Sequence, residues 1–257
     1  MRIVIKVGTS TLTHATGHVN IRRMEGLVKV LSDLKNAGHE MILVSSGAIG
    51  MGVGKLNLKQ RPKDMPGKQA AAAVGQCELM YTYDRMFSEY NHTVAQILLT
   101  GEDLENIDRR TNFENTIETL LQLGALPVIN ENDTIATAEI KVGDNDTLSA
   151  IVSGCVKADL LVLMSDIDGL YTADPHTDPN AKKLDIVPSV TPEIEALAGG
   201  AGSSLGTGGM ITKIRAAKMV TENGCDMVIV NGRDAIVLYK ILDGENVGTR
   251  FLGRKEQ

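Results

Sequence analysis

Six short apolar runs constrain the fold of this chain more than any other feature of its sequence. Each run is rich in β-branched residues and bounded by Gly, Asp or Asn, as buried strands usually are. The runs lie at residues 3–7, 41–46, 94–100, 126–131, 159–166 and 226–232. We predict a strand from each of them.

Helical patterns separate several of these runs. In residues 21–37, 111–123 and 212–223, apolar side chains recur every three and four positions. A glycine follows each pattern, at Gly38, Gly124 and Gly224, where helices commonly end. Strands that alternate with such helices predict an α/β fold with a mainly parallel central sheet, covered by helices on both faces.

The composition limits the classes of partner. The chain has 257 residues, 43% of them hydrophobic, which suits one large domain or two closely packed lobes. Its formal charge is −6 and it has no basic cluster, so we expect no nucleic acid as a main partner. Cys77, Cys155 and Cys225 show neither disulfide nor zinc-site spacing. With no signal peptide or membrane-length apolar stretch, we expect a soluble, cytoplasmic protein.

Polar residues and glycines gather where the predicted strands end, which is where ligands bind in parallel sheets. They include Lys6 and Gly8 after the first strand, Ser46 and Gly47 after the second, residues 130–133 after the fourth, and residues 165–169 after the fifth. A lysine inside an apolar strand needs an anionic partner or a route to solvent. A ligand site at this sheet edge accounts for both the lysine and the glycines.

The stretch SLGTGGMITK, residues 204–213, joins a glycine-rich loop to a helix with an early lysine. Free backbone amides, a helix N-terminus and the charge of Lys213 together suit a phosphate group. The spacing matches neither the P-loop nor the dinucleotide-binding pattern. An exposed loop of no function is the alternative reading of these glycines.

Two acidic clusters flank residues 134–143. Asn130, Glu131, Asn132 and Asp133 form the first cluster, and Asp144, Asn145 and Asp146 form the second. One residue of the second cluster is explained as a helix N-cap, but the two clusters together suit a metal ion or an ammonium group. The segment DIDG at 166–169 lacks most positions of a calcium loop, so a nucleotide contact is the better interpretation.

Two lysines, two glycine turns and acidic clusters favour phosphoryl transfer. The five histidines form no pair at metal spacing, and no serine or cysteine has an evident His/Asp companion. A carboxylate acceptor needs no base, because it is already an anion at neutral pH. Lysines and Mg²⁺ would then offset its repulsion from the phosphates of ATP.

Five segments resemble the glutamate 5-kinases of the amino acid kinase family. They are IKVGTS, VSSGAIGMG, VINENDTIATAEIKVGDNDTLSA, SDIDGLYTADP and GTGGMITK, and the resemblance runs from residue 6 to about residue 251. It implies a three-layer αβα sandwich that uses ATP with Mg²⁺ to phosphorylate the γ-carboxylate of L-glutamate, the first step of proline biosynthesis. It also implies an acceptor-binding lobe at about residues 1–155 and a nucleotide-binding lobe at 156–257.

The resemblance also implies roles for individual residues. The catalytic group comprises Lys6 and Lys213 on the transferring phosphoryl group, with Asp146 orienting them. Glutamate is held by Ser46, Gly47, Asp133 and Asn145. The nucleotide contacts are Lys6, Gly8, Ser165, Asp166, Thr207, Gly208, Gly209, Met210, Ile211, Thr212 and Lys213, with no metal site of the protein's own because Mg²⁺ arrives with ATP.

Several expectations follow from the resemblance alone. Many relatives continue into a C-terminal PUA domain, whereas this sequence resembles the short form without it. Proline is expected as a feedback inhibitor, a homodimer or homotetramer as the assembly, and the reductase that consumes γ-glutamyl phosphate as a possible partner.

Three other classes of protein fit the sequence less well. Another amino acid kinase, acting on N-acetylglutamate, aspartate, carbamate or UMP, is the nearest alternative. The acidic clusters disfavour the acetylated acceptor, which lacks a free ammonium group, and an acceptor with a phosphate group would need arginines that the acceptor half does not place at strand ends. A nucleotide-binding regulator without turnover would not need both Lys6 and Lys213. A dehydrogenase would need the dinucleotide fingerprint, which is missing.

Overall fold

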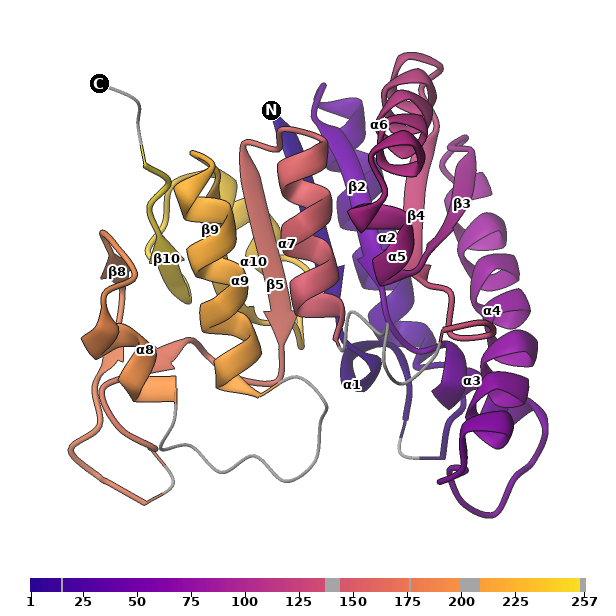
Figure 1. Ribbon diagram of the computed structural model, residues 1–257, viewed down its shortest axis with the longest axis horizontal. Helices are drawn as coiled ribbons and strands as arrows, with labels where there is room; N and C mark the ends of the chain where they lie inside the picture. Colours follow the sequence, from indigo (N-terminus) through magenta and orange to yellow (C-terminus); the bar gives the residue numbers. More distant parts are fainter. Residues whose placement is uncertain (15, 137–143, 176, 199–208, 255–257) are drawn as a thin grey trace.

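The computed structural model describes residues 1–14, 16–136, 144–175, 177–198 and 209–254. A central sheet carries helices on both faces, so the predicted three-layer αβα architecture is confirmed (Figure 1). Thr207 and Gly208, two of the predicted nucleotide contacts, lie outside the described residues.

Ten strands lie in the described residues, and eight of them form the central sheet in the order β3-β4-β2-β1-β5-β9-β10-β8. Its pairings are parallel except between β9 and β10, so the predicted mainly parallel sheet is confirmed. The strands of this sheet are β1 Arg2–Val7, β2 Glu40–Ser45, β3 Val94–Leu99, β4 Leu126–Glu131, β5 Leu160–Ser165, β8 Ile186–Val187, β9 Asp226–Asn231 and β10 Thr249–Phe251, while β6 Leu170–Tyr171 and β7 Lys183–Leu184 form a separate antiparallel pair.

All six predicted strands are present, and so are the three predicted helices. The helices in the described residues are α1 Thr9–Leu12, α2 Ile21–Asn36, α3 Ala48–Lys55, α4 Met65–Ser88, α5 Gly101–Glu105, α6 Ile107–Gln122, α7 Asn145–Cys155, α8 Pro192–Ala198, α9 Met210–Glu222 and α10 Val237–Leu242. No helix among the described residues is long and apolar enough to cross a bilayer.

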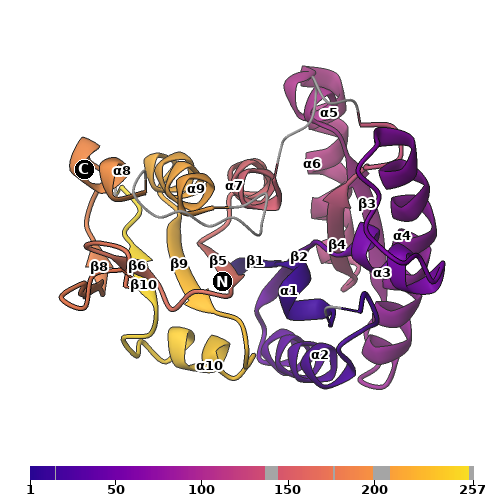
Figure 2. The ribbon, with the colours of Figure 1, turned by 90° about the horizontal axis from the view of Figure 1, so that it is seen from below.

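Two apolar clusters form the core, one on each face of the sheet. One cluster joins the sheet to α6, α7 and α9, and the other joins it to α2, α4 and α10. Figure 2 shows these two groups of helices on opposite sides of the strands. Side chains of β1 alternate between the clusters, since Ile3 and Ile5 lie in the second and Val4 in the first. The next residue on the Val4 side is Lys6, which therefore faces α7 and α9.

Helices α3 and α4 pack unusually closely through small residues. A Cβ atom added at Gly75 of α4 would lie 1.7 Å from the carbonyl oxygen of Ala48, and one added at Gly52 of α3 would lie 1.8 Å from that of Ala71. Both glycines are therefore required for the contact itself. The contact fixes α3, whose first residue directly follows Ser46 and Gly47 in the chain.

We expect Gly75→Ala to lower the free energy of unfolding by about 3 kcal/mol, because overpacking moves two helices apart. The matched control is Gly26→Ala on α2, where an added Cβ has no neighbour within 4 Å. The control should stabilise the protein by about 0.5–1 kcal/mol, as alanine favours helix over glycine. Urea denaturation of both variants measures the difference, and equal stability of the two would contradict the close contact.

Candidate active site

The carboxylate of Asp146 lies between the ammonium groups of two lysines. Asp146 is the second residue of α7, and its side chain is completely buried. Its Oδ1 lies 2.8 Å from Lys6 Nζ, and its Oδ2 lies 3.0 Å from Lys213 Nζ. The structure thus brings together the three predicted catalytic side chains, and we call this group the lysine clamp.

Three elements position the clamp. Lys6 comes from β1, Asp146 from the first turn of α7, and Lys213 from the first turn of α9. Helices α7 and α9 lie side by side over the sheet, as Figures 1 and 2 both show. Side chains alternate between the two faces of a strand, so Lys6 projects toward these helices while its neighbours Ile5 and Val7 project to the opposite face.

Burial and charge act in opposite directions on Asp146. Removal from water disfavours the carboxylate, but the two adjacent lysines outweigh this effect and hold the pKa of Asp146 below its ordinary value. The lysines are themselves buried, with residue exposures of 9% for Lys6 and 4% for Lys213. These three side chains together carry one net positive charge, which suits an anionic ligand.

Thr212 adds a further donor to the clamp. Its single hydroxyl hydrogen is shared between two acceptors, Asp146 Oδ2 at 2.9 Å and the carbonyl oxygen of Gly209 at 2.7 Å. Gly209 is the N-cap of α9, so the threonine links the start of this helix to the buried carboxylate. The sequence identified Thr212 as a nucleotide contact but gave no signal for this bond.

We expect Thr212→Val to lower kcat about tenfold, because Asp146 loses one of its donors and holds Lys213 less firmly. Thr221→Val is the matched control on the same helix, since Thr221 Oγ1 bonds only carbonyl oxygens of α9, at Ala217 and Lys218. Steady-state kinetics with saturating substrates measures both. An equal fall in kcat for the two variants would show that the bond to Asp146 has no special role.

Polar side chains beside the clamp form a second group. Asn145 precedes Asp146 on α7, and its Nδ2 lies 2.7 Å from Ser46 Oγ and 3.1 Å from Asn130 Oδ1. Gly47 directly follows Ser46 in the chain and is the N-cap of α3. Its φ is 110°, a conformation that glycine adopts readily. The structure therefore brings together Ser46, Gly47 and Asn145 of the predicted glutamate site.

The acidic clusters separate into different roles. Asp144 accepts from the amide of Thr147 at 2.8 Å and from its hydroxyl at 3.0 Å, so it is the N-cap of α7. Asp146 belongs to the clamp. The carboxylates of Asp144 and Asp146 are therefore engaged within the protein, whereas Asp133 of the first cluster is half-buried just beyond β4.

The predicted nucleotide contacts lie at neighbouring strand and helix ends. Ser165 ends β5, and its Oγ donates to Asp166 Oδ1 at 3.1 Å. A Cβ added at Gly8 would lie 3.7 Å from Lys6 Nζ, so this glycine lies directly beside the clamp. Of the loop before α9, Gly209 and Met210 are half-buried and Ile211 is 55% exposed.

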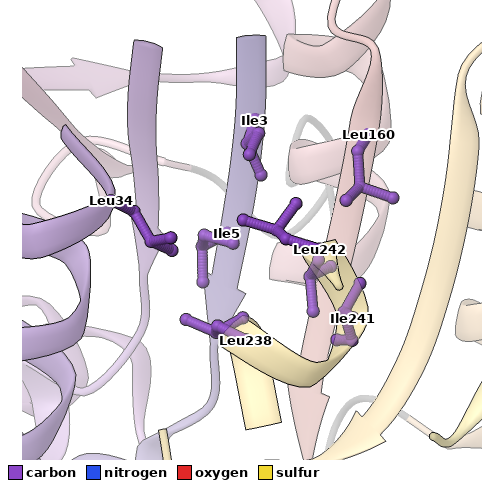
Figure 3. A pocket seen from close by; sticks show the side chains of 8 residues that line it. Ile3, Ile5, Leu34, Leu160, Leu238, Ile241 and Leu242 are labelled. Atoms are coloured by element: carbon purple, nitrogen blue, oxygen red, sulfur yellow. The ribbon is translucent and has the colours of Figure 1, made fainter. Parts of the chain in front are cut away.

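An apolar hollow on the opposite face of the sheet is lined, among the described residues, by no polar or reactive side chain. It lies between β1, β5, α2 and α10 and is lined by aliphatic side chains alone (Figure 3). Its lining residues are Ile3, Ile5, Leu34, Leu160, Val162, Leu238, Ile241 and Leu242. The hollow is a packing feature of the core.

The amino acid kinase family model matches residues 1–231, which include the whole clamp and its polar neighbours. This chain belongs to the amino acid kinase family. The predicted family is thus confirmed, and the predicted likeness to the glutamate 5-kinases is confirmed by curated relatives.

Curated relatives in this family carry the name glutamate 5-kinase. The relative from Clostridium perfringens is 55% identical over 99% of this chain and 96% of its own length. The relative from Listeria monocytogenes serotype 4a is 52% identical over 100% of this chain and 94% of its own. The relative from Moorella thermoacetica is 54% identical over 100% of this chain but 68% of its own length.

Solved structures of other kinases share the fold. Carbamate kinase from Giardia lamblia, bound to AMP-PNP, aligns with a TM-score of 0.69 at 16% identity, covering 98% of each chain. Isopentenyl phosphate kinase from T. acidophilum aligns with a TM-score of 0.68 at 17% identity, covering 98% of this chain and 100% of its own. At such low identity the likeness concerns the fold alone.

Proposed function

We propose that this chain transfers the γ-phosphoryl group of ATP to the γ-carboxylate of L-glutamate, giving γ-glutamyl phosphate. The observation that carries the proposal is the lysine clamp beside the polar group of Ser46 and Asn145. Asn145 and Asp146 are consecutive residues, so the acceptor group and the phosphoryl group meet at the start of α7. Relatives more than half identical over nearly the whole chain carry the name of this activity.

The clamp suits the charge distribution of the reaction. During transfer, negative charge spreads over the phosphoryl oxygens while a second anion, the acceptor carboxylate, approaches. Lys6 and Lys213 offset both charges from fixed positions, and fixed donors need no reorganisation as the charge develops. Asp146 keeps the two ammonium groups together against their mutual repulsion.

Ser46, Gly47, Asn145 and Asp133 are the residues that we assign to glutamate. A hydroxyl group and backbone amides near the start of α3 suit its carboxylates, while Asp133 and the Asn145 carbonyl oxygen suit its ammonium group. Residues 1–155 then provide most of the acceptor lobe, and residues 156–257 most of the nucleotide lobe. In that second lobe, Ser165, Asp166 and the start of α9 contact ATP.

Mg²⁺ fits this site as a companion of ATP. Both oxygens of Asp146 face lysines, and the described residues contain no gathering of three or more Asp, Glu, His or Cys side chains that would hold a metal ion. The nucleotide phosphates would be its main ligands, and the ion would supply further charge compensation. The lysines and Asp146 perform the positioning that the protein itself contributes.

The family resemblance supports further parts of the proposal. They are a cytoplasmic location, a homo-oligomer, feedback inhibition by proline, and use of the labile acyl phosphate by a reductase. Each follows from the likeness to the glutamate 5-kinases.

Trapping the product with hydroxylamine tests the proposed function. The protein is incubated with Mg²⁺ and ATP, and the hydroxamate formed from L-glutamate, N-acetylglutamate or L-aspartate is measured by its iron complex. We expect hydroxamate from L-glutamate alone. A preference for another acceptor would overturn the assignment of Asp133 and Asn145, and ATP binding without turnover of any acceptor would indicate a regulator.

A further inference from the structure

Helix α4 presents a row of polar side chains to the acceptor side of the site. Gln69, Gln76 and Tyr83 are seven residues apart, which places them on one face of the helix. Gln69 Nε2 lies 3.4 Å from the Ala136 carbonyl oxygen, Gln76 Oε1 lies 2.9 Å from Asn130 Nδ2, and Tyr83 Oη lies 2.9 Å from Ser45 Oγ. The helix thus contacts the segments that follow or end β2 and β4.

The middle contact fixes the orientation of a chain of amides. Asn130 Oδ1 accepts from the amide of Glu131 at 2.9 Å and from Asn145 Nδ2 at 3.1 Å. Because this side of Asn130 accepts, its Nδ2 must donate, and it meets Oε1 of Gln76. Gln76 Nε2 has no acceptor among the described residues, so Gln76 contacts the site through its side-chain oxygen alone.

The orientation continues to the groups that meet the substrate. Asn145 Nδ2 donates to both Asn130 and Ser46, which uses its two hydrogens and leaves its carbonyl oxygen as an acceptor. Ser46 Oγ accepts from Asn145, so its own hydrogen is available to a ligand. An acceptor and a donor in these places suit an ammonium group and a carboxylate, respectively.

If these side-chain amides were reversed, they would present the wrong groups to the substrate. If Asn130 turned its amino group toward Asn145, that residue would turn its oxygen inward and present its amino group to the ligand. An amino group repels an ammonium group, and selectivity for a free amino acid would fall. The backbone amide of Glu131 is a fixed donor to Asn130 Oδ1 and opposes this reversal, and Gln76 reinforces it, because its oxygen accepts from the Asn130 amino group where both residues are buried, at 8% and 3% exposure.

We infer that Gln76 is a positioning residue that sets the selectivity of the site for an acceptor bearing a free ammonium group. This inference rests on the proposed glutamate kinase function and adds the residue that orients its acceptor site. Gln76 acts through Asn130 and Asn145, and its contribution is to binding the acceptor rather than to transferring the phosphoryl group.

The test compares L-glutamate with glutarate, which keeps both carboxylates and lacks the ammonium group. For Gln76→Met, which keeps the volume and removes the acceptor, we expect the ratio of kcat/KM for L-glutamate to that for glutarate to fall about tenfold. The fall should come from a higher KM for L-glutamate, with the KM for ATP unchanged. Hydroxamate formation measures both acceptors.

Tyr83→Phe is the matched control, because it removes a buried hydrogen bond from the same face of α4 outside the amide chain. We expect it to keep the native acceptor ratio. Gln76→Glu is a second variant that keeps an oxygen toward Asn130, so it should also keep the ratio within about threefold. Equal ratios in Gln76→Met and Tyr83→Phe, or a lost ratio in Gln76→Glu, would overturn the role of Gln76.

Failure of this inference is distinguishable from failure of the proposed function. An unmodified protein that makes no hydroxamate from L-glutamate would refute the function itself. An unmodified protein that is active, with variants whose acceptor ratios match it, would refute only the role of Gln76. Thermal unfolding of each variant identifies a loss of fold. If Gln76→Met does not fold, the acceptor ratio of Gln76→Glu decides whether Gln76 has the proposed role.

Discussion

Lys213→Ala is expected to lower kcat for γ-glutamyl phosphate formation by about 10²–10³-fold. Lys213 supplies one of two fixed charges that compensate the transferring phosphoryl group, and no neighbour in the clamp replaces it. Asp146 keeps Lys6 as a partner, so the fold should survive. Hydroxamate formation measures turnover, and calorimetry with ATP measures binding, which should persist.

Lys218→Ala is the control for this experiment. Lys218 also lies on α9, but it is exposed and pairs with Glu195 at 2.7 Å on the surface. Exposed pairs contribute little to stability, so kcat and the melting temperature should change only slightly. A Lys213→Ala enzyme as active as Lys218→Ala would refute the catalytic role of the clamp.

Asp146→Asn should have the largest effect on stability, at about 3–5 kcal/mol at neutral pH. The substitution keeps the shape of the side chain but leaves two buried ammonium groups without an anion. Asp144→Asn is the matched control, because it makes the same change two residues away at an N-cap, where Asn serves as well as Asp. Urea denaturation at pH 7 should show a large loss for the first variant and a change of a few tenths of a kcal/mol for the second.

The pH dependence of Asp146→Asn provides a further check on the same variant. The folded-state pKa of Asp146 lies below the unfolded value, which is about 4. Its contribution is therefore fully present above about pH 4 and is lost as the pH falls through the folded-state pKa. The stability difference between native protein and variant should stay constant from pH 7 to about pH 5 and shrink under stronger acid. A difference that grew on acidification would contradict the paired, ionised carboxylate.

Most of the sheet was predictable from sequence because five of its strands, β1, β2, β4, β5 and β9, are buried on both faces. Continuous β-branched runs such as residues 3–7 signal this environment directly, and all six predicted strands exist within about two residues of their predicted bounds. Helix α6 begins four residues before its predicted start, because Asn106 caps it ahead of the first periodic apolar residue. Short strands such as β8 have no run long enough to detect.

Helix α4, the longest in the described residues, escaped prediction for a physical reason. Its first half packs through Gly75 and the small residues Ala71 and Ala72, and only its second half buries large side chains, at Leu79, Tyr83 and Phe87, so no apolar stripe runs along the whole helix. Gln76 was missed with it. A polar residue inside a helix gives no sequence signal of the side chain that it will meet across the fold.

The candidate site was more predictable than its internal contacts. Strand ends and glycine turns indicated Lys6, Ser46 and Lys213, because the carboxyl edge of a parallel sheet is a general place for ligands. The different roles of Asp144 and Asp146 could not be predicted from the sequence. Both residues precede or begin the same helix, and only their side-chain directions assign one to the cap and the other to the lysines.

The lysine clamp has a consequence for the order in which the chain is made. Its first lysine leaves the ribosome with β1, its aspartate with α7, and its second lysine only with α9. The reactive centre therefore cannot exist on a nascent chain that has folded only its early strands. A fragment that ends before α9 would offer Asp146 one lysine instead of two, and phosphoryl transfer would begin only once α9 had emerged.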